Sequence, residues 1–253
     1  MAGHWLNPVR QALDARESPL TMFVRDDDAG WADERLDALL DLFDEVACPI
    51  DLAVIPAELT EARAAWLLER RARSTHHIGL HQHGFAHANH EARERKSEFG
   101  RSRSPSRARV DVQAGRDLMR ARLGDAVDPV FTPPWNRCRD ELGPVLVEAG
   151  LDILSRDRSA GVMGTPGLRE CPVTVDWCAA GRGVDPAPVE HGVQLAGAVR
   201  GDSVLGLMLH HAVMDDDDRS RLAELLRLVV LHGSVRCLSL REAAGPAGAD
   251  RRA

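Results

Sequence analysis

The chain of 253 residues has no tyrosine and few other aromatic residues, which make up 4% of it. It also lacks a basic excess, because its formal net charge is −7. A surface that binds nucleic acid neutralises phosphates with an excess of lysine and arginine. We therefore expect no nucleic-acid partner.

The sequence also shows no close cysteine pair and no long apolar run, and its first residues do not have the pattern of a leader. The five cysteines are spread along the chain without a C-x-x-C pair, which argues against a disulfide scaffold and against a thiolate zinc cluster. The opening sequence MAGHWLNPVRQALDAR has no basic segment followed by an apolar core, and no apolar run approaches membrane-spanning length. These absences predict a cytoplasmic protein without a membrane span, and they leave its oligomeric state open.

Short apolar runs alternate with amphipathic helical segments from Thr21 onward. Strands are expected at Thr21–Asp26, Ile50–Pro56, His77–His83, Pro129–Pro133, Leu151–Ser155, Cys171–Trp177, Ser203–His211 and Ser234–Leu240. Helices are expected at Asp33–Val46 and Glu58–Arg73, around Arg107–Leu123 and Arg139–Ala149, and between the last two strands. Because the strands are apolar without alternation, we expect a mostly parallel sheet covered by helices.

About seven strand–helix units in one chain predict an α/β fold with a closed or nearly closed (β/α) barrel. An open, doubly wound sheet is the alternative, but DDDAG follows the first strand where a glycine-rich dinucleotide turn would stand. Residues 1–20 are expected to form an N-terminal extension, residues 21–243 the barrel domain and residues 244–253 a disordered tail. The polar, arginine-rich stretch Glu91–Val110 is expected to be a long loop.

Polar residues follow several of the expected strands. They are Asp26, Asp27, Asp28, His81, His83, His87, the segment Thr132–Arg137, Asp176, Trp177, His210 and His211. Because active residues of a parallel barrel sit at the carboxyl ends of its strands, we expect these distant residues to converge on one rim.

Two imidazoles and a carboxylate form a ligand set suited to Zn²⁺ or a similar divalent ion. His83 and His87 are four residues apart, and Gly84 between them permits a sharp turn of the backbone. The three successive aspartates would repel one another unless a cation offset their charge. The alternatives are a polar, histidine-rich loop and an acidic cap on the following helix.

The motifs resemble, in order, those of the polysaccharide deacetylase family, carbohydrate esterase family four and its relatives. That family has an aspartate pair after the first strand, H-x-x-x-H after the third, R-x-P-[YW], D-W and a late L-x-H. The matching stretches here are Asp26-Asp27, His83 to His87, TPPW, Asp176-Trp177 and LMLHH. The resemblance spans roughly Thr21 to Leu240 and implies a distorted, incomplete (β/α) barrel.

The resemblance also implies a reaction, the removal of an acyl group, expected to be N-acetyl, from a carbohydrate. Because no export signal is seen, we expect an intracellular carbohydrate substrate. Asp26 would be the general base and His210 the general acid, while Asp27, His83 and His87 would bind the metal, expected to be Zn²⁺. The Trp135 amide would be the first N–H after Thr132 able to stabilise an oxyanion, because two prolines intervene. Asp176 and the indole rings of Trp135 and Trp177 would complete the substrate site, although both tryptophans are equally suited to a core.

Several departures from the family pattern leave alternatives open. Thr132 stands where the family has an arginine, for which Arg25 or Arg137 could substitute. The register could shift, with Asp27 as the base and Asp28 as the ligand. The metal ligands could include His81 or His90 in place of one of the expected histidines. Only one of the successive residues His210 and His211 can face the site.

Other functions compatible with these residues are a carbohydrate-binding protein without turnover, a glycosidase that uses Asp26 and Asp176, and, as the weakest alternative, an iron oxygenase. The arginine-rich loop offers Lys96, Arg101 or Arg103 to an anionic substrate.

Overall fold

The computed structural model describes residues 4–178 and 188–246. Its strands are β1 (Leu20–Ala29), β2 (Ile50–Val54), β3 (Ile78–His83), β4 (Val127–Thr132), β5 (Ile153–Leu154), β6 (Arg169–Glu170), β7 (Val175–Asp176), β8 (Val204–Leu209) and β9 (Val235–Cys237). All pairings between these strands are parallel, in the order β6-β5-β4-β3-β2-β1-β8-β7, with β9 also paired to β1. The curled sheet is an incomplete α/β barrel, so the predicted fold class is confirmed.

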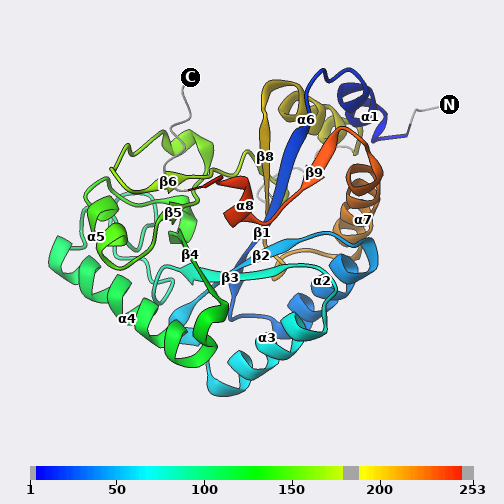
Figure 1. Cartoon of the computed structure of the whole chain (residues 1–253). Helices are drawn as coiled ribbons and strands as arrows, with labels where there is room; N and C mark the ends of the chain where they lie inside the picture. The colour runs from blue at the N-terminus through cyan, green and yellow to red at the C-terminus, as the bar shows by residue number, and fades with distance from the viewer. Residues whose placement is uncertain (1–3, 179–187, 247–253) are drawn as a thin grey trace.

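Helices surround the curved sheet, and α8 lies near its centre (Figure 1). They are α1 (Asn7–Asp14), α2 (Asp33–Val46), α3 (Glu61–Arg73), α4 (Pro105–Leu123), α5 (Leu142–Glu148), α6 (Pro188–Gly201), α7 (Asp216–Leu231) and α8 (Leu240–Ala243). Short 3₁₀ turns occur at Pro56–Glu58, Gly124–Ala126, Pro134–Asn136 and Arg158–Ala160. Within the described residues, no helix has both the length and the apolar character that a membrane crossing requires.

The apolar pattern explains where these elements pack. All five residues of β2 are buried, as expected for a parallel strand covered on both faces. On α2, Leu36, Leu39, Leu40 and Phe43 follow helical spacing and are buried in the main core between helices and sheet. Full burial of each such side chain contributes about 1.5–3 kcal/mol.

A second apolar cluster fills the inside of the curved sheet. Phe23, Val130, Ile153 and Met208 come from four strands and pack together with Leu240 of α8. Helix α8 therefore covers this interior cluster. The opposite, carboxyl ends of the strands carry the polar residues of the candidate site.

Parts of the expected N-terminal extension, of the expected tail and of the arginine-rich loop pack against the barrel. Val9 and Leu13 of α1 are buried in the main core, so the segment expected as an extension packs onto the barrel. Residues 247–253 of the expected tail lie outside the described residues, whereas Ala244 is buried. Helix α4 begins at Pro105, and Phe99 anchors the preceding loop by packing edge-on against Phe131 at 5.6 Å.

Candidate metal and catalytic site

A cavity of about 770 Å³ opens at the carboxyl ends of the strands. Its lining comes from distant parts of the chain: Asp27, Asp28, His83, His87, Arg95, Lys96, Trp135, Asn136, Arg137, Asp157, Ser159, Ala160, Asp176, Met208 and His210. The structure thus brings most of the predicted rim residues to one place.

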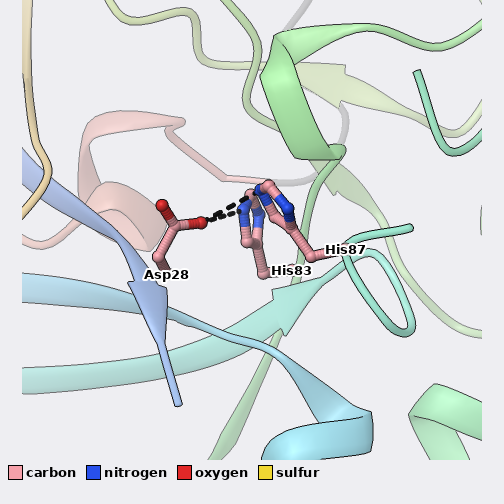
Figure 2. A group of neighbouring side chains, drawn as sticks. All are labelled: Asp28, His83 and His87. Atoms are coloured by element: carbon pink, nitrogen blue, oxygen red, sulfur yellow. Dashed lines mark hydrogen bonds and ion pairs between the residues drawn. The ribbon is translucent and has the colours of Figure 1, made fainter. Parts of the chain in front are cut away.

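Asp28, His83 and His87 line this cavity, and their side chains point toward one another (Figure 2). Asp28 Oδ1 lies 3.2 Å from His83 Nε2 and 3.1 Å from His87 Nε2. The potential donor atoms of the three residues lie within 4.8 Å of one another. One carboxylate and two imidazoles at this spacing fit a divalent cation with positions left for water and substrate.

Neighbouring groups hold the two imidazoles in place. His83 Nδ1 donates to the Thr132 carbonyl at 3.0 Å, which leaves Nε2 facing Asp28. A carbonyl behind the ring in this way is the usual orienting partner of a metal-bound histidine. The segment that carries His87 is held by buried Glu98, whose carboxylate accepts from the amides of residues 85 and 86 at 3.1 and 2.8 Å. Glu98 could not be predicted as a functional residue, because an acidic residue in an arginine-rich loop has no distinctive spacing.

Unusual backbone conformations are concentrated at this cavity. Asp28, His87, Trp135 and Asn136 line it and have positive φ angles between 52° and 69°. They are four of the six non-glycine residues with positive φ among those the structure describes. Such conformations cost energy and cluster at functional sites, where surrounding contacts enforce them.

The charges of the cluster favour the ligand form of the carboxylate. Burial raises the pKa of Asp28, but hydrogen bonds from His83 and His87 outweigh it, so the pKa lies well below its usual value. Burial lowers the pKa of His83, and the hydrogen bond to Asp28 more than reverses this effect, so the pKa is raised. Asp28 is therefore ionised, and the imidazoles face a negative charge.

Asp27, predicted as the metal ligand, occupies a different environment. Arg25 Nε and Nη2 donate to its two carboxylate oxygens at 2.7 and 3.0 Å, and both residues are buried. The remaining guanidinium contacts include Ser155 and Asn136, so Arg25 is held from several sides. Burial raises the pKa of Asp27, but the charge of Arg25, with those of His83 and His210, lowers it below its usual value.

Asp26, predicted as the general base, does not line the cavity. Its carboxylate accepts from the backbone N–H of His211 at 2.9 Å and contacts His211 Nδ1 at 2.6 Å, with both side chains inaccessible to solvent. The two aspartates that line the cavity therefore lie one residue further along the chain than the expected pair. The backbone turn at Asp28, where φ is 69°, brings Asp27 and Asp28 rather than Asp26 and Asp27 to the cavity.

The other candidate histidines differ in whether they line the cavity. His210 follows β8 and lines the cavity, whereas His211 is buried beside Asp26. His81 is buried and does not line the cavity; it contacts the Thr132 hydroxyl at 3.0 Å, and burial lowers its pKa to about 3. Neither His81 nor His90 belongs to the three-residue cluster around Asp28.

Two of the three residues expected to contact substrate lie at the cavity, and the third does not. Trp135 lines the cavity, and its ring centroid is 4.4 Å from that of His87. Asp176 lines the cavity as well. Trp177 instead lies in the main core against Trp5, with 2% of its surface exposed, so its expected role as a wall of the substrate slot is wrong.

Basic side chains from the arginine-rich loop reach the edge of the cavity. Arg95 and Lys96 line it and are exposed, and Arg137 donates to the Lys96 carbonyl at 3.0 Å. Arg103 is instead paired with Asp111 on α4. Of the three basic residues offered by the sequence, Lys96 is the one that lines this cavity.

Comparisons with known proteins identify the fold. No protein-family model and no curated protein matches the sequence. A Mycobacterium smegmatis protein provisionally described as a polysaccharide deacetylase superposes with a TM-score of 0.65 at 17% identity, covering 91% of this chain and 90% of that one. A family four acetyl xylan esterase from Clostridium thermocellum, in complex with cobalt, gives 0.54 at 15% identity, with 88% and 89% covered.

A Bacillus anthracis pseudoenzyme of carbohydrate esterase family four is also similar, with a TM-score of 0.56 at 14% identity, covering 90% of this chain and 66% of that one. At these identities the comparisons establish the fold. The chain has the polysaccharide deacetylase fold, as the resemblance of its motifs predicts.

Proposed function

We propose that this protein is a metal-dependent hydrolase that removes an acyl group, namely N-acetyl, from a carbohydrate. The observation that carries the proposal is the meeting of an Asp28–His83–His87 cluster with an arginine-held carboxylate, Asp27, in one cavity. The fold is shared with carbohydrate esterases, one of which is in complex with cobalt.

Asp28, His83 and His87 would hold a divalent ion, for which Zn²⁺ suits the mixed carboxylate and imidazole set. Such an ion, when bound, lowers the pKa of water and polarises an acyl carbonyl. The Nδ1–H of His83 is committed to the Thr132 carbonyl, so this side chain presents Nε2 to the ion.

The other residues of the cavity supply proton transfer. Asp27 accepts the proton of the attacking water, and Arg25 fixes the orientation of its carboxylate. His210 donates a proton to the departing amine, and the backbone N–H of Trp135 stabilises the developing oxyanion. Arg25 thereby takes the place of the arginine that Thr132 replaces in the family motif.

Three aspartate variants test these assignments against one another. We expect Asp28→Asn to lose the metal, Asp27→Asn to keep the metal while turnover falls about 10²–10⁴-fold, and Asp26→Asn to keep both. The measurements are metal content by mass spectrometry and acetate release from N-acetylated sugars. Metal retained in Asp28→Asn, or unchanged turnover in Asp27→Asn, would contradict the assignment.

A carbohydrate-binding protein without turnover is the second candidate. Thr132 and the structural likeness to a pseudoenzyme favour it. The two candidates differ in one measurement, because a binding protein would retain an N-acetylated sugar without releasing acetate in the presence of Zn²⁺. A glycosidase that uses Asp26 is disfavoured, because that carboxylate is buried beside His211.

The basic side chains at the cavity edge indicate which kind of sugar the cavity would favour. Arg95, Lys96 and Arg137 would favour a sugar that carries an anionic group, such as a phosphate. Lys96→Ala should then raise KM for a phosphorylated N-acetyl sugar more than for its neutral counterpart. An equal change for both sugars would remove the argument for an anionic group.

A further inference from the structure

A second group of polar side chains meets at the opposite edge of the sheet. Asp51 is the second residue of β2, His77 immediately precedes β3, and Asp128 is the second residue of β4. The three strands are neighbours and run parallel, so their amino ends lie along one edge. The candidate catalytic site, in contrast, lies at the carboxyl ends.

The facing atoms of this group lack hydrogen-bond partners within residues 4–178 and 188–246. Asp51 Oδ1, His77 Nε2 and Asp128 Oδ2 are buried, and none of them has a partner among the described residues. His77 Nε2 is 3.9 Å from Asp128 Oδ2, which is too long for a hydrogen bond, yet the donor atoms of the three residues lie within 4.8 Å of one another. Asp51 and Asp128 are only 1% and 7% exposed. Buried polar atoms need a partner, which in such places is usually water or an ion.

The carboxylates are held in this orientation from outside the group. The other oxygen of Asp51 accepts from the Leu240 amide at 2.7 Å, and the other oxygen of Asp128 accepts from Arg241 at 3.4 Å. Both donors belong to α8, which covers the interior of the barrel. Asp51 therefore has one oxygen bonded to the backbone of α8, and Asp128 has one oxygen in a longer contact with an exposed arginine of α8. The other oxygen of each carboxylate has no such partner and belongs to the group.

Gly79 leaves the space between these side chains open. It pairs with Asp51 across β2 and β3, and a Cβ at this position would lie 2.1 Å from Asp51 Oδ1 and 3.2 Å from His77 Nε2. Its φ lies outside the left-handed region, so backbone conformation does not require glycine here. The absence of a side chain instead allows the two donor atoms to approach each other.

We propose that Asp51, His77 and Asp128 bind a second divalent cation, such as Zn²⁺, that ties β2, β3 and β4 to the start of α8. One imidazole and two carboxylates are a suitable donor set for it. Its position at the amino ends of the strands indicates a stabilising rather than a catalytic role. The alternative is a protonated Asp51, because burial raises the pKa of its carboxyl to about 8, or a water molecule between the three groups.

The number of metal ions bound per chain distinguishes a second cation from a protonated Asp51 or a water molecule. The full chain is stripped with a chelator, reloaded with Zn²⁺, freed of excess ion and analysed by mass spectrometry. We expect about two ions per chain for the wild type and about one each for His77→Ala, Asp128→Asn and His83→Ala. His76→Ala is the matched control, since His76 adjoins His77 outside the group, and it should keep about two. Undiminished binding in His77→Ala, or loss of all bound ion in His83→Ala, would overturn the proposal.

A second measurement isolates the proposed ion from the catalytic one. In the His83→Ala background, Zn²⁺ should raise the thermal unfolding midpoint, and adding His77→Ala should abolish that rise. The readout requires no substrate, so the site can be established even if the proposed hydrolase activity fails. No shift in His83→Ala would count against the second ion, because its own ligands are intact in that variant.

Discussion

Replacement of Asp26 by asparagine is expected to destabilise the protein in a pH-dependent way. His211 Nε2 contacts the Trp31 carbonyl at 2.8 Å, and its Nδ1 contacts the Asp26 carboxylate at 2.6 Å. A carbonyl and a carboxylate can only accept, so both ring nitrogens carry protons and His211 is an imidazolium. Burial lowers the pKa of His211, but the charge of Asp26 outweighs this effect and raises the pKa from 6.5 to about 9.

The size and sign of the effect follow from proton linkage. A rise in pKa from 6.5 to about 9 corresponds to about 3 kcal/mol of stability in the folded state. This contribution is fully present below about pH 6.5, where folded and unfolded chains both hold the proton. Between pH 6.5 and 9 only the folded chain retains it, so stability falls as the pH rises and the contribution is lost above about pH 9.

Urea unfolding of the wild type and Asp26→Asn at about pH 6, 7.5 and 9.5 measures this contribution. The variant should be less stable by up to about 3 kcal/mol at the lowest pH, and the difference should shrink at the highest. Asp14→Asn is the control, because Asp14 pairs with His232 but is 64% exposed, so its loss should cost less than about 1 kcal/mol. If Asp26→Asn loses turnover while its stability equals that of the wild type at every pH, Asp26 belongs to the catalytic machinery and the reasoning fails.

Three further predictions concern the site and its support. Arg25→Gln should retain the metal but lose about 3–5 kcal/mol of stability, because it leaves the carboxylate of Asp27 buried and unpaired, and the acid limb of its rate profile should move to higher pH. An unmoved acid limb would mean that Arg25 does not set the pKa of Asp27. Gly84→Ala should destabilise the protein by at least about 1 kcal/mol in urea, because φ is +57° and the added Cβ would lie 2.1 Å from Glu98 Oε2. Phe131→Ala should lower the unfolding free energy by about 3–5 kcal/mol without loss of metal, and metal loss would indicate that this core supports the site directly.

The fold could be predicted because strand and helix periodicities alternate along most of the chain. The carboxyl ends of parallel strands meet by geometry, so the convergence of the aspartates and histidines could also be anticipated. Helix α6 was not anticipated, because Gly192 and Gly197 interrupt its otherwise weak amphipathic pattern.

The register within the aspartate run could not be obtained in the same way. Regular strand alternation would place Asp26 and Asp28 on one face and Asp27 on the other. The positive φ of Asp28 breaks this alternation at the last step, and nothing in three identical residues indicates where the break falls. The Asp51 and Asp128 group was overlooked for a related reason, since lone aspartates near strand starts have no motif spacing.

Arg25 and Asp27 belong to one extended strand, two residues apart, so their side chains emerge on the same face without help from any connecting segment. The guanidinium also donates to Asn136 Oδ1 at 2.7 Å, in the turn after β4, and to the carbonyl and hydroxyl of Ser155, which follows β5. One arginine thus links the carboxylate of Asp27 on β1 to the segments that leave β4 and β5. A change in the turn after β4 would therefore alter the orientation of this carboxylate together with the shape of the cavity entrance, so the two cannot vary independently.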